Sequence, residues 1–235
     1  MKKQKSLLIS TIVLGVLSIA FTLLICLVDK SNIGPQNSSV GFSKLNQIFK
    51  NLFGYNELFY KLTQVLGYIV IGLALAYMVI AFIQLIKRKS IKNIDIQLSL
   101  LVIFYAIIIA IYFVFELAKI NYRPVILDGK LEPSYPSSHT MLAVFICTTS
   151  LFVNQKIVNN KTLRIILDTI ISIIGLAVVI GRIISGVHWI TDIIGAILIS
   201  TTLTLAYLTI TNYLSNKNKS SDDKEAIQTE QANHD

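Results

Sequence analysis

Three short stretches of the chain carry ionisable and hydroxyl side chains at spacings that could do chemistry. They are residues 116–124 (ELAKINYRP), residues 136–139 (PSSH) and residues 181–192 (GRIISGVHWITD). Each lies in or beside a long apolar run, where an ionisable side chain is costly and therefore needs a reason. Two of the three histidines of the chain, His139 and His188, fall within them. These stretches are therefore the candidates for a functional site.

Their residue types suit the transfer of a phosphoryl group. The planar guanidinium groups of Arg123 and Arg182 match the oxygens of a phosphate. His188 and Asp192 are four residues apart and would share one face of a helix, so the carboxylate could accept a hydrogen bond from one ring nitrogen and leave the other as a nucleophile. His139, on a separate stretch, could protonate a leaving oxygen.

The beginning of the fourth apolar run offers a second way to hold an anion. The first amides of a helix have no partner within the helix, and the helix dipole places positive charge there. Ser137 adds a hydroxyl at this point. Together with the histidines and arginines, these groups predict a phosphoryl-transfer site that uses no metal and no cofactor.

The composition places these stretches in a membrane protein. Of 235 residues, 54% are apolar and only 14% are charged, whereas an average soluble domain carries about 25% charged residues. A helix needs about 20 apolar residues to cross the hydrocarbon core of a bilayer. Six runs meet or approach this length: residues 6–28, 65–86, 96–115, 140–153, 165–184 and 189–214. The sequence therefore predicts an all-α integral membrane protein with six transmembrane helices, of which the fourth is the weakest.

The basic residues predict how these helices are oriented. With the N-terminus in the cytoplasm, most Lys and Arg residues fall on the cytoplasmic side of six spans, as the positive-inside rule requires. Both termini are then cytoplasmic, and the three polar stretches meet on the extracytoplasmic face. The net charge of +8 follows from this topology, and no nucleic-acid partner is expected because a soluble basic domain is missing.

The segment between the first two spans has a pattern of its own. Within residues 29–61, apolar side chains that include Leu45, Ile48 and Leu52 recur at three- and four-residue spacing, with lysine and asparagine side chains on the other side. This pattern predicts an amphipathic helix lying in the membrane interface. Such a helix could be a lid or guide for a lipid substrate, or a packed connector between two spans.

The distribution of apolar and polar residues along the sequence divides the chain into two parts. Residues 1–214 are expected to form one membrane domain, with its chemistry in residues 116–192. Residues 215–235 are polar and mixed in charge, which predicts a disordered cytoplasmic tail. The oligomeric state is left open by the sequence.

The three stretches resemble the motifs of the phosphatidic acid phosphatase type 2 superfamily, the lipid phosphate phosphatases, whose relatives include bacterial acid phosphatases and vanadium haloperoxidases. The family motifs are Lys, six residues, Arg-Pro; then Pro-Ser-Gly-His; then Ser-Arg, five residues, His, three residues, Asp. Residues 116–124, 136–139 and 181–192 match them in order and spacing.

The resemblance implies a role for each matching residue. It makes His188 the nucleophile that forms a phosphohistidine, Asp192 its orienting partner and His139 the general acid. It makes Arg123, Arg182 and Ser137 ligands of the phosphate, assisted by the backbone N–H of Ser138.

The sequence departs from the family pattern at three positions. Glu116 stands where the family has Lys, Ser138 where it has Gly, and Gly181 where it has Ser. Lys119, about one helical turn nearer to Arg123, could supply the missing cation. These changes bear on substrate preference more than on the reaction.

The resemblance implies a membrane phosphatase with the lipid bilayer and a lipid phosphate as its partners. Candidate substrates are a polyprenyl diphosphate of the undecaprenyl type, phosphatidic acid and phosphatidylglycerol phosphate. The alternative is a non-catalytic or weakly active transporter or scaffold on the same fold, which Glu116 favours. A vanadium peroxidase is remote, because the chain lacks the large soluble helical bundle of those enzymes.

Overall fold

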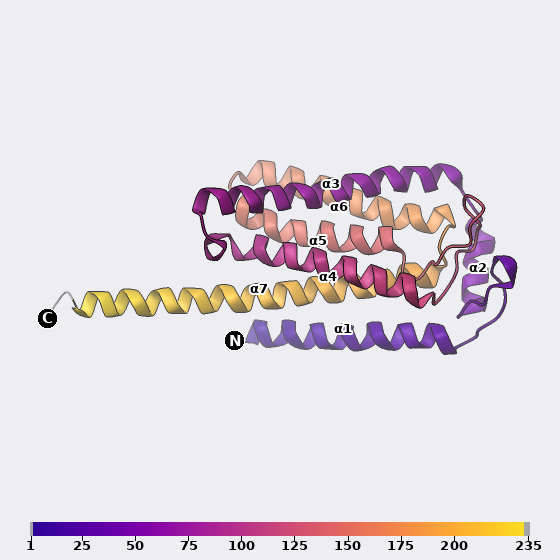
Figure 1. The fold of residues 1–235 in the computed structure, drawn as a ribbon, viewed down its shortest axis with the longest axis horizontal. Helices are drawn as coiled ribbons and strands as arrows, with labels where there is room; N and C mark the ends of the chain where they lie inside the picture. Colours follow the sequence, from indigo (N-terminus) through magenta and orange to yellow (C-terminus); the bar gives the residue numbers. More distant parts are fainter. Residues whose placement is uncertain (1, 233–235) are drawn as a thin grey trace.

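The computed structural model describes the backbone of residues 2–232 and the side chains of residues 4–91 and 93–217. Within this range the chain is nearly all helical. Six long helices run along one axis, and a shorter helix crosses one end of the bundle (Figure 1). The helices are α1 Lys2–Leu27, α2 Ser43–Phe53, α3 Glu57–Arg88, α4 Ile96–Ala118, α5 Ser138–Ile157, α6 Lys161–Ser185 and α7 Ile190–Ala232, with short 3-10 turns at Pro35–Asn37 and Ile91–Asn93.

Helices α1 and α3 to α7 are long and apolar enough to cross a membrane. They correspond to the six apolar runs of the sequence, so the predicted all-α architecture is confirmed. Large apolar side chains are exposed along the outer faces of α1, α3, α4 and α6, for example Ile9, Ile69, Val114 and Ile173. Apolar faces of this extent suit hydrocarbon and not water. The protein is therefore a multi-pass membrane protein.

Helix α5 is the centre of the bundle and contacts α3, α4, α6 and α7. Its polar side chains find partners inside the protein. The hydroxyl of Tyr77 donates to the side chain of Asn154 (2.7 Å), whose amide donates to Asp168 (2.8 Å). Because α5 is surrounded by other helices, it needs fewer apolar residues than a lipid-facing span. This location explains why its run is the weakest of the six in the sequence.

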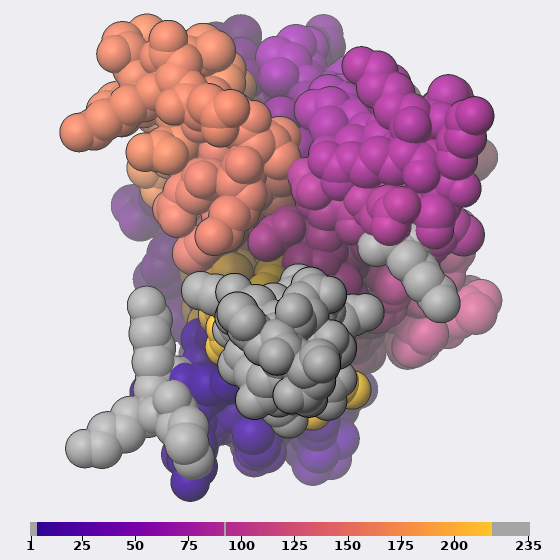
Figure 2. Space-filling view, turned by 90° about the vertical axis from the view of Figure 1, so that its left-hand side faces the viewer, coloured from indigo at the N-terminus to yellow at the C-terminus, as the bar shows by residue number. Residues whose placement is uncertain are grey.

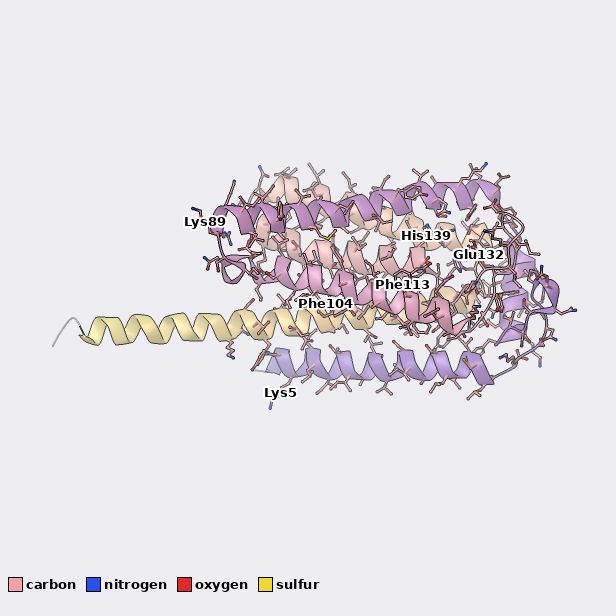
Figure 3. The ribbon with its side chains drawn as sticks, viewed as in Figure 1. Lys5, Lys89, Phe104, Phe113, Glu132 and His139 are labelled. Carbon is pink, nitrogen blue, oxygen red and sulfur yellow. The ribbon has the colours of Figure 1, made fainter. Side chains whose placement is uncertain are left out.

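The connections gather at the two ends of the bundle. One end, called the α2 end here, holds α2, the α4–α5 connection and the turn between α6 and α7 (Figure 1). Figure 3 shows His139 and Glu132 toward this end and Lys89 at the other. The α3–α4 and α5–α6 connections form the opposite end, which faces the viewer in Figure 2. All three polar stretches of the sequence therefore share the α2 end.

Helix α2 lies across this end with its polar edge facing inward. Asn46 is fully buried, and its amide nitrogen donates to the Gly41 carbonyl (2.8 Å) and to the Thr191 hydroxyl (3.0 Å) at the start of α7. Ile48 and Leu52 are exposed on the other side. An apolar outer face and a polar inner edge suit a helix that touches lipid. The predicted interfacial helix is thus present, and Asn46 ties it to α7.

The backbone of α7 continues as helix through residues 215–232, a stretch for which the sequence predicts a disordered tail. Several residues in this stretch, such as Lys, Glu, Gln and Ala, favour helix, and the transmembrane part of α7 provides the nucleus that an isolated helix would have to form. Residues 233–235 lie outside the described range.

A glycine is required where α6 ends against the connection between α2 and α3. Gly186 has a left-handed φ of +64°, and a Cβ at this position would lie 1.5 Å from the carbonyl oxygen of Gly54. Next to it, the amide of Asn56 donates to the carbonyl of Ser185 (3.0 Å). This close backbone contact fixes the turn that follows α6.

We expect Gly186→Ala to lower the thermal unfolding midpoint of the purified protein. A left-handed alanine costs about 1–2 kcal/mol, and the backbone at Gly54 must also move. The fluorescence of Trp189, the only tryptophan, reports the transition. The control is Gly72→Ala in α3, where no atom lies within 4 Å of the added Cβ and the midpoint should be unchanged or slightly higher. Equal midpoints for both variants would contradict this account of the turn.

Candidate active site

The connection between α4 and α5 is a hairpin that sets Arg123 beside a carboxylate. Asp128 and Gly129 form its tip, and both have positive φ (49° and 71°), as a two-residue hairpin turn requires. Arg123 donates its amide to the carbonyl of Glu132 (3.0 Å). Its Nε also lies 3.1 Å from a carboxylate oxygen of Glu132. The hairpin therefore positions the guanidinium group of Arg123, most of which is buried.

The beginning of α5 is an open helix N-terminus. The amide of its N-cap residue, Ser137, donates to the carbonyl of Asp192 in α7 (3.1 Å), and its hydroxyl donates to the hydroxyl of Thr140 (3.0 Å). The amides of Ser138, His139 and Thr140 have no acceptor within the described part of the chain. Three free amides at a helix N-terminus favour the binding of an anion.

His188 lies in the turn between α6 and α7 and is buried. Its Nδ1 lies 3.1 Å from the carbonyl oxygen of Ser134. A carbonyl can only accept, so Nδ1 carries the proton and Nε2 the lone pair. Nε2 is buried and has no hydrogen-bond partner among the described residues. The ring is thus held in the tautomer that a nucleophilic Nε2 requires.

Asp192 holds the turn that carries this ring. One of its oxygens lies 3.6 Å from Nδ1 of His188, beyond hydrogen-bond distance, and accepts from the amide of Trp189 (3.0 Å). The other accepts from the side chain of Asn121 (3.3 Å). The bond to Trp189 closes the first turn of α7 in the manner of a capping box. Asp192 therefore holds the turn that carries the ring, whereas the carbonyl of Ser134 is the hydrogen-bond partner of the ring.

Arg182 and His139 lie against α3. The guanidinium of Arg182 lies 5.5 Å from the centroid of the Tyr60 ring, and one of its nitrogens donates to the side chain of Gln64 (3.4 Å). The ring of His139 packs on Gly67, where a Cβ would lie 2.7 Å from its Cδ2. The absence of a side chain at Gly67 therefore makes the space for the imidazole of His139.

Several buried donors of the arginines lack a partner. Among the described residues, none accepts a hydrogen bond from Nε or Nη1 of either Arg123 or Arg182. The Glu132 oxygen near Nε of Arg123 forms an ion pair with it. Each buried donor without an acceptor costs about 1–3 kcal/mol. An anion bound between them would remove this cost, as the oxygens of a phosphate can accept from both side chains.

A cavity of about 110 Å³ lies next to His188. Arg123, Ser138 and His188 line it, so each of the three polar stretches contributes at least one residue. Glu116 and Glu132 also line this cavity. The structure thus brings the three stretches together around one small polar space.

The arginines also act on His188 through their charge. Burial lowers the pKa of His188 well below its ordinary value of 6.5, and the positive charges of Arg123 and Arg182 lower the pKa further. The hydrogen bond to Ser134 opposes this shift. His188 is therefore neutral at physiological pH, and Arg182 influences the ring although it does not line the cavity.

Of the predicted site residues, Arg123, Ser138 and His188 line this cavity, whereas Ser137, His139, Arg182, Asp192 and Lys119 do not.

Lys119 also departs from the predicted arrangement in its backbone. It is exposed and caps the C-terminus of α4 in a left-handed conformation (φ 48°). Glu116 takes the place beside Arg123 instead. The left-handed cap turns the chain away from the helix, so helical spacing does not predict the position of Lys119.

Three residues that contribute to the site were not identified from the sequence. Ser134 acts through its carbonyl, which no side-chain pattern reveals, and Asn121 is an amide in a polar loop. The Asp128–Gly129 pair indicates a tight hairpin, but a two-residue turn alone would set Val125 opposite Glu132. The structure pairs Arg123 with Glu132 instead, so the partner of Arg123 could not be read from the turn.

The structure explains one departure from the family pattern. A Cβ at Gly181 would lie 2.5 Å from the methyl group of Thr63 in α3. The serine that the family has at this position would need Thr63 to move, so glycine here follows from close packing between α3 and α6.

We expect the ring of His188 to remain neutral at the pH where an unperturbed histidine is half protonated, about 6.5. Because the folded-state pKa is lowered, protonation and its spectral change should begin only at lower pH. Nitrogen-15 NMR of histidine-labelled protein measures this, with His188→Ala to assign the resonance. A midpoint near 6.5 for His188 would contradict the described burial and tautomer.

The comparisons with known proteins point to one superfamily. The model of the PAP2 superfamily matches residues 114–216, which contain all three polar stretches. No curated protein matches the chain.

Two solved structures are similar to the chain. One is described as the first transmembrane PAP2 type phosphatidylglycerolphosphate phosphatase from Bacillus subtilis; it has a TM-score of 0.56 and 18% identity, and the match covers 91% of this chain and 98% of that chain. The other is Aquifex aeolicus LpxE, with a TM-score of 0.43 and 18% identity over 71% of this chain and 96% of that chain. The first shares the fold over nearly its whole length. Over residues 114–216, the part that carries the three polar stretches, the chain is similar to the PAP2 superfamily.

Proposed function

We propose that the protein is a membrane phosphatase that hydrolyses a lipid phosphate or diphosphate through a phosphohistidine on His188. One observation carries the proposal. Nδ1 of this ring is held by the carbonyl of Ser134 (3.1 Å), while Nε2 is buried and unpartnered among the described residues. A neutral imidazole in this state is a nucleophile, and a phosphorus centre held by arginines is an electrophile that suits it.

The reaction is a double displacement. Nε2 of His188 attacks phosphorus, the N–P bond forms, and the bond from phosphorus to the leaving oxygen breaks. His139, in its protonated form, donates a proton to that oxygen. Water then attacks the phosphohistidine, His139 takes a proton from it, and phosphate leaves. The lipid alcohol, or the lipid monophosphate from a diphosphate, is the other product.

The arginines and the beginning of α5 stabilise the transition state. Negative charge grows on the equatorial oxygens of phosphorus, and preorganised donors lower its energy. Arg123 and Arg182 supply the unpartnered N–H groups, and the amide of Ser138 is one of three free amides at the N-terminus of α5. The hydroxyl of Ser137 would turn from Thr140 to a phosphate oxygen.

The substrate class and the membrane side are part of the same proposal. Candidate substrates are polyprenyl diphosphates of the undecaprenyl type and glycerolipid phosphates such as phosphatidic acid and phosphatidylglycerol phosphate. The termini are proposed to be cytoplasmic and the α2 end extracytoplasmic, because Lys89 lies at the opposite end in Figure 3 and follows directly on Lys87 and Arg88 in the last turn of α3. Substrate would then enter laterally from the outer leaflet, beside the exposed apolar face of α2.

A second function, ligand binding without turnover in a transporter or scaffold, is favoured by one observation. Glu116 lines the cavity where the family has lysine, and a carboxylate oxygen of Glu132 forms an ion pair with Nε of Arg123 (3.1 Å). These carboxylates oppose a phosphate dianion. Phosphate release by the purified protein separates the two functions.

We expect the full-length protein in lipid nanodiscs to release phosphate from at least one lipid phosphate of a panel that contains polyprenyl diphosphate, phosphatidic acid and phosphatidylglycerol phosphate. His188→Ala should lower turnover by about 10³-fold or more, because the nucleophile is lost. The matched control is His234→Ala, the third histidine, which should keep turnover within about twofold. Full turnover by His188→Ala would disprove the mechanism, and no release from any substrate would disprove the phosphatase.

We expect Gly67→Ala to lower kcat by about 10- to 100-fold, because a catalytic group displaced by about 1 Å can lose that much. The added Cβ would lie 2.7 Å from the ring of His139 and must displace it. Gly72→Ala, about one turn further along α3, has no atom within 4 Å and should leave kcat unchanged. Similar kcat values for the two variants would argue against His139 as the general acid.

A further inference from the structure

The cavity beside His188 contains two carboxylates that phosphate binding does not explain. Glu116 and Glu132 both line it, together with Arg123. If His188 is neutral, these three side chains give the cavity wall a net charge of −1. Arg182 lies nearby but does not line this space. A phosphate dianion that enters without a cation would therefore be repelled by this negatively charged wall.

The same wall carries aromatic rings. Tyr112, Phe115 and Tyr135 line the cavity on the side of α4, and the rings of Phe115 and Tyr135 meet edge to face with centroids 5.4 Å apart. Aromatic faces attract cations, most of all organic ammonium groups. Carboxylates and aromatic rings together form the type of wall that binds an ammonium group.

A further observation indicates that this space receives a ligand. Nε2 of His188 is buried and has no hydrogen-bond partner among the described residues. His188 lines the cavity and is more than nine-tenths buried. Unpartnered polar groups in a buried polar space are satisfied when a ligand or water occupies it.

We propose that Glu116 and Glu132 form an ammonium subsite next to the phosphate subsite, so that the protein acts on the monophosphate of an amino alcohol. The inference rests on the proposed phosphatase function and names its substrate class. The cavity holds about 110 Å³, so the ammonium and the phosphate must sit on neighbouring carbons. Phosphate binds toward Arg123, Ser138 and His188, and the ammonium binds toward the two carboxylates.

The ion pair of Arg123 couples the two subsites. Glu132 lies 3.1 Å from Nε of Arg123 in the absence of substrate. An ammonium group that binds Glu132 weakens the ion pair between Glu132 and Arg123. Both edges of the Arg123 guanidinium can then donate hydrogen bonds to phosphate. A substrate without the amine leaves Glu132 on Arg123 and Glu116 without a counter-charge. The amine therefore improves the binding of the phosphate as well as its own.

A bound divalent cation could also balance the charge. It would need more ligands than two carboxylates, since Mg²⁺ takes six oxygen ligands. In the described part of the chain, no three His, Cys, Asp or Glu side chains gather as a ligand set. The ammonium is therefore the cation that the wall fits better, and the test includes Mg²⁺ as a competing outcome.

The experiment compares two substrates that differ only in the amine. A long-chain 2-aminoalkyl phosphate and the same alkyl phosphate without the amine are hydrolysed by the full-length protein in nanodiscs. We expect kcat/KM to be at least about tenfold higher for the amine, the effect of one partly desolvated cation contact. Glu116→Gln and Glu132→Gln should each reduce this ratio to about twofold or less. A ratio near one in the unmodified protein, or an unchanged ratio in both variants, overturns the proposal.

The matched control is Glu57→Gln, an exposed glutamate at the start of α3 whose partner is Lys61 (2.7 Å). The ratio should not change in this variant. A parallel pair, 2-aminoethyl phosphate and ethyl phosphate, identifies the source of the ligand. A preference in both pairs supports a subsite that also takes soluble phosphates, and a preference in the long-chain pair alone supports a subsite for lipids. If added Mg²⁺ raises the rate for the alkyl phosphate to that for the amine, and a chelator abolishes both rates, the subsite binds a metal and the proposal is wrong.

A binding measurement separates failure of this inference from failure of the proposed function. The dissociation constants of a long-chain 2-aminoalkyl phosphonate and of the matched alkyl phosphonate are measured, because neither can be hydrolysed. One possible result is that no substrate releases phosphate, while the aminoalkyl phosphonate binds at least about tenfold more tightly than the alkyl phosphonate and Glu116→Gln removes this preference. This result would support the ammonium subsite and disprove the phosphatase function. Equal binding of the two phosphonates overturns the subsite whether or not turnover is observed.

Discussion

The hydrogen bond from Nδ1 of His188 to the carbonyl of Ser134 (3.1 Å) is the interaction on which the site depends. Ser134 is itself fixed, because its amide donates to the carbonyl of Asn121 (2.8 Å), whose side chain donates to Asp192 (3.3 Å). Asp192 in turn caps the helix that follows His188 through the amide of Trp189. The hairpin, the ring and the beginning of α7 thus form one closed set of bonds, and a shift in any of them moves Nε2.

The membrane imposes the second constraint. Polar groups within the bundle cannot rely on water, so they pair with one another or with a ligand. Around α5 polar side chains pair with one another, as the Tyr77–Asn154–Asp168 bonds illustrate. At the α2 end, donors of Arg123 and Arg182 remain without acceptors in the described structure. Cationic donors without acceptors gather at that end, and this is the physical basis for assigning an anion site to it.

The sequence was sufficient to predict the six spans, the helix across one end and the gathering of three polar stretches there, because apolar run length and ionisable residues in apolar runs are local signals. It could not show that His188 bonds to the backbone carbonyl of Ser134 instead of to Asp192, since backbone groups leave no pattern in the side chains. It placed Lys119 by helical spacing, but α4 ends there in a left-handed cap. The pairing of Arg123 with Glu132 depends on a hairpin register that only the fold reveals in full.

The most direct test of the account is to locate the phosphate on the enzyme during turnover. The protein is mixed with substrate, quenched in alkali, in which phosphohistidine survives, and the modified peptide is examined by mass spectrometry and phosphorus NMR. The account predicts a phosphate on Nε2 of His188, because Nδ1 is occupied by its proton and by the carbonyl of Ser134. A phosphate on Nδ1, a phosphate on another residue, or turnover with no phosphoenzyme at all would contradict it.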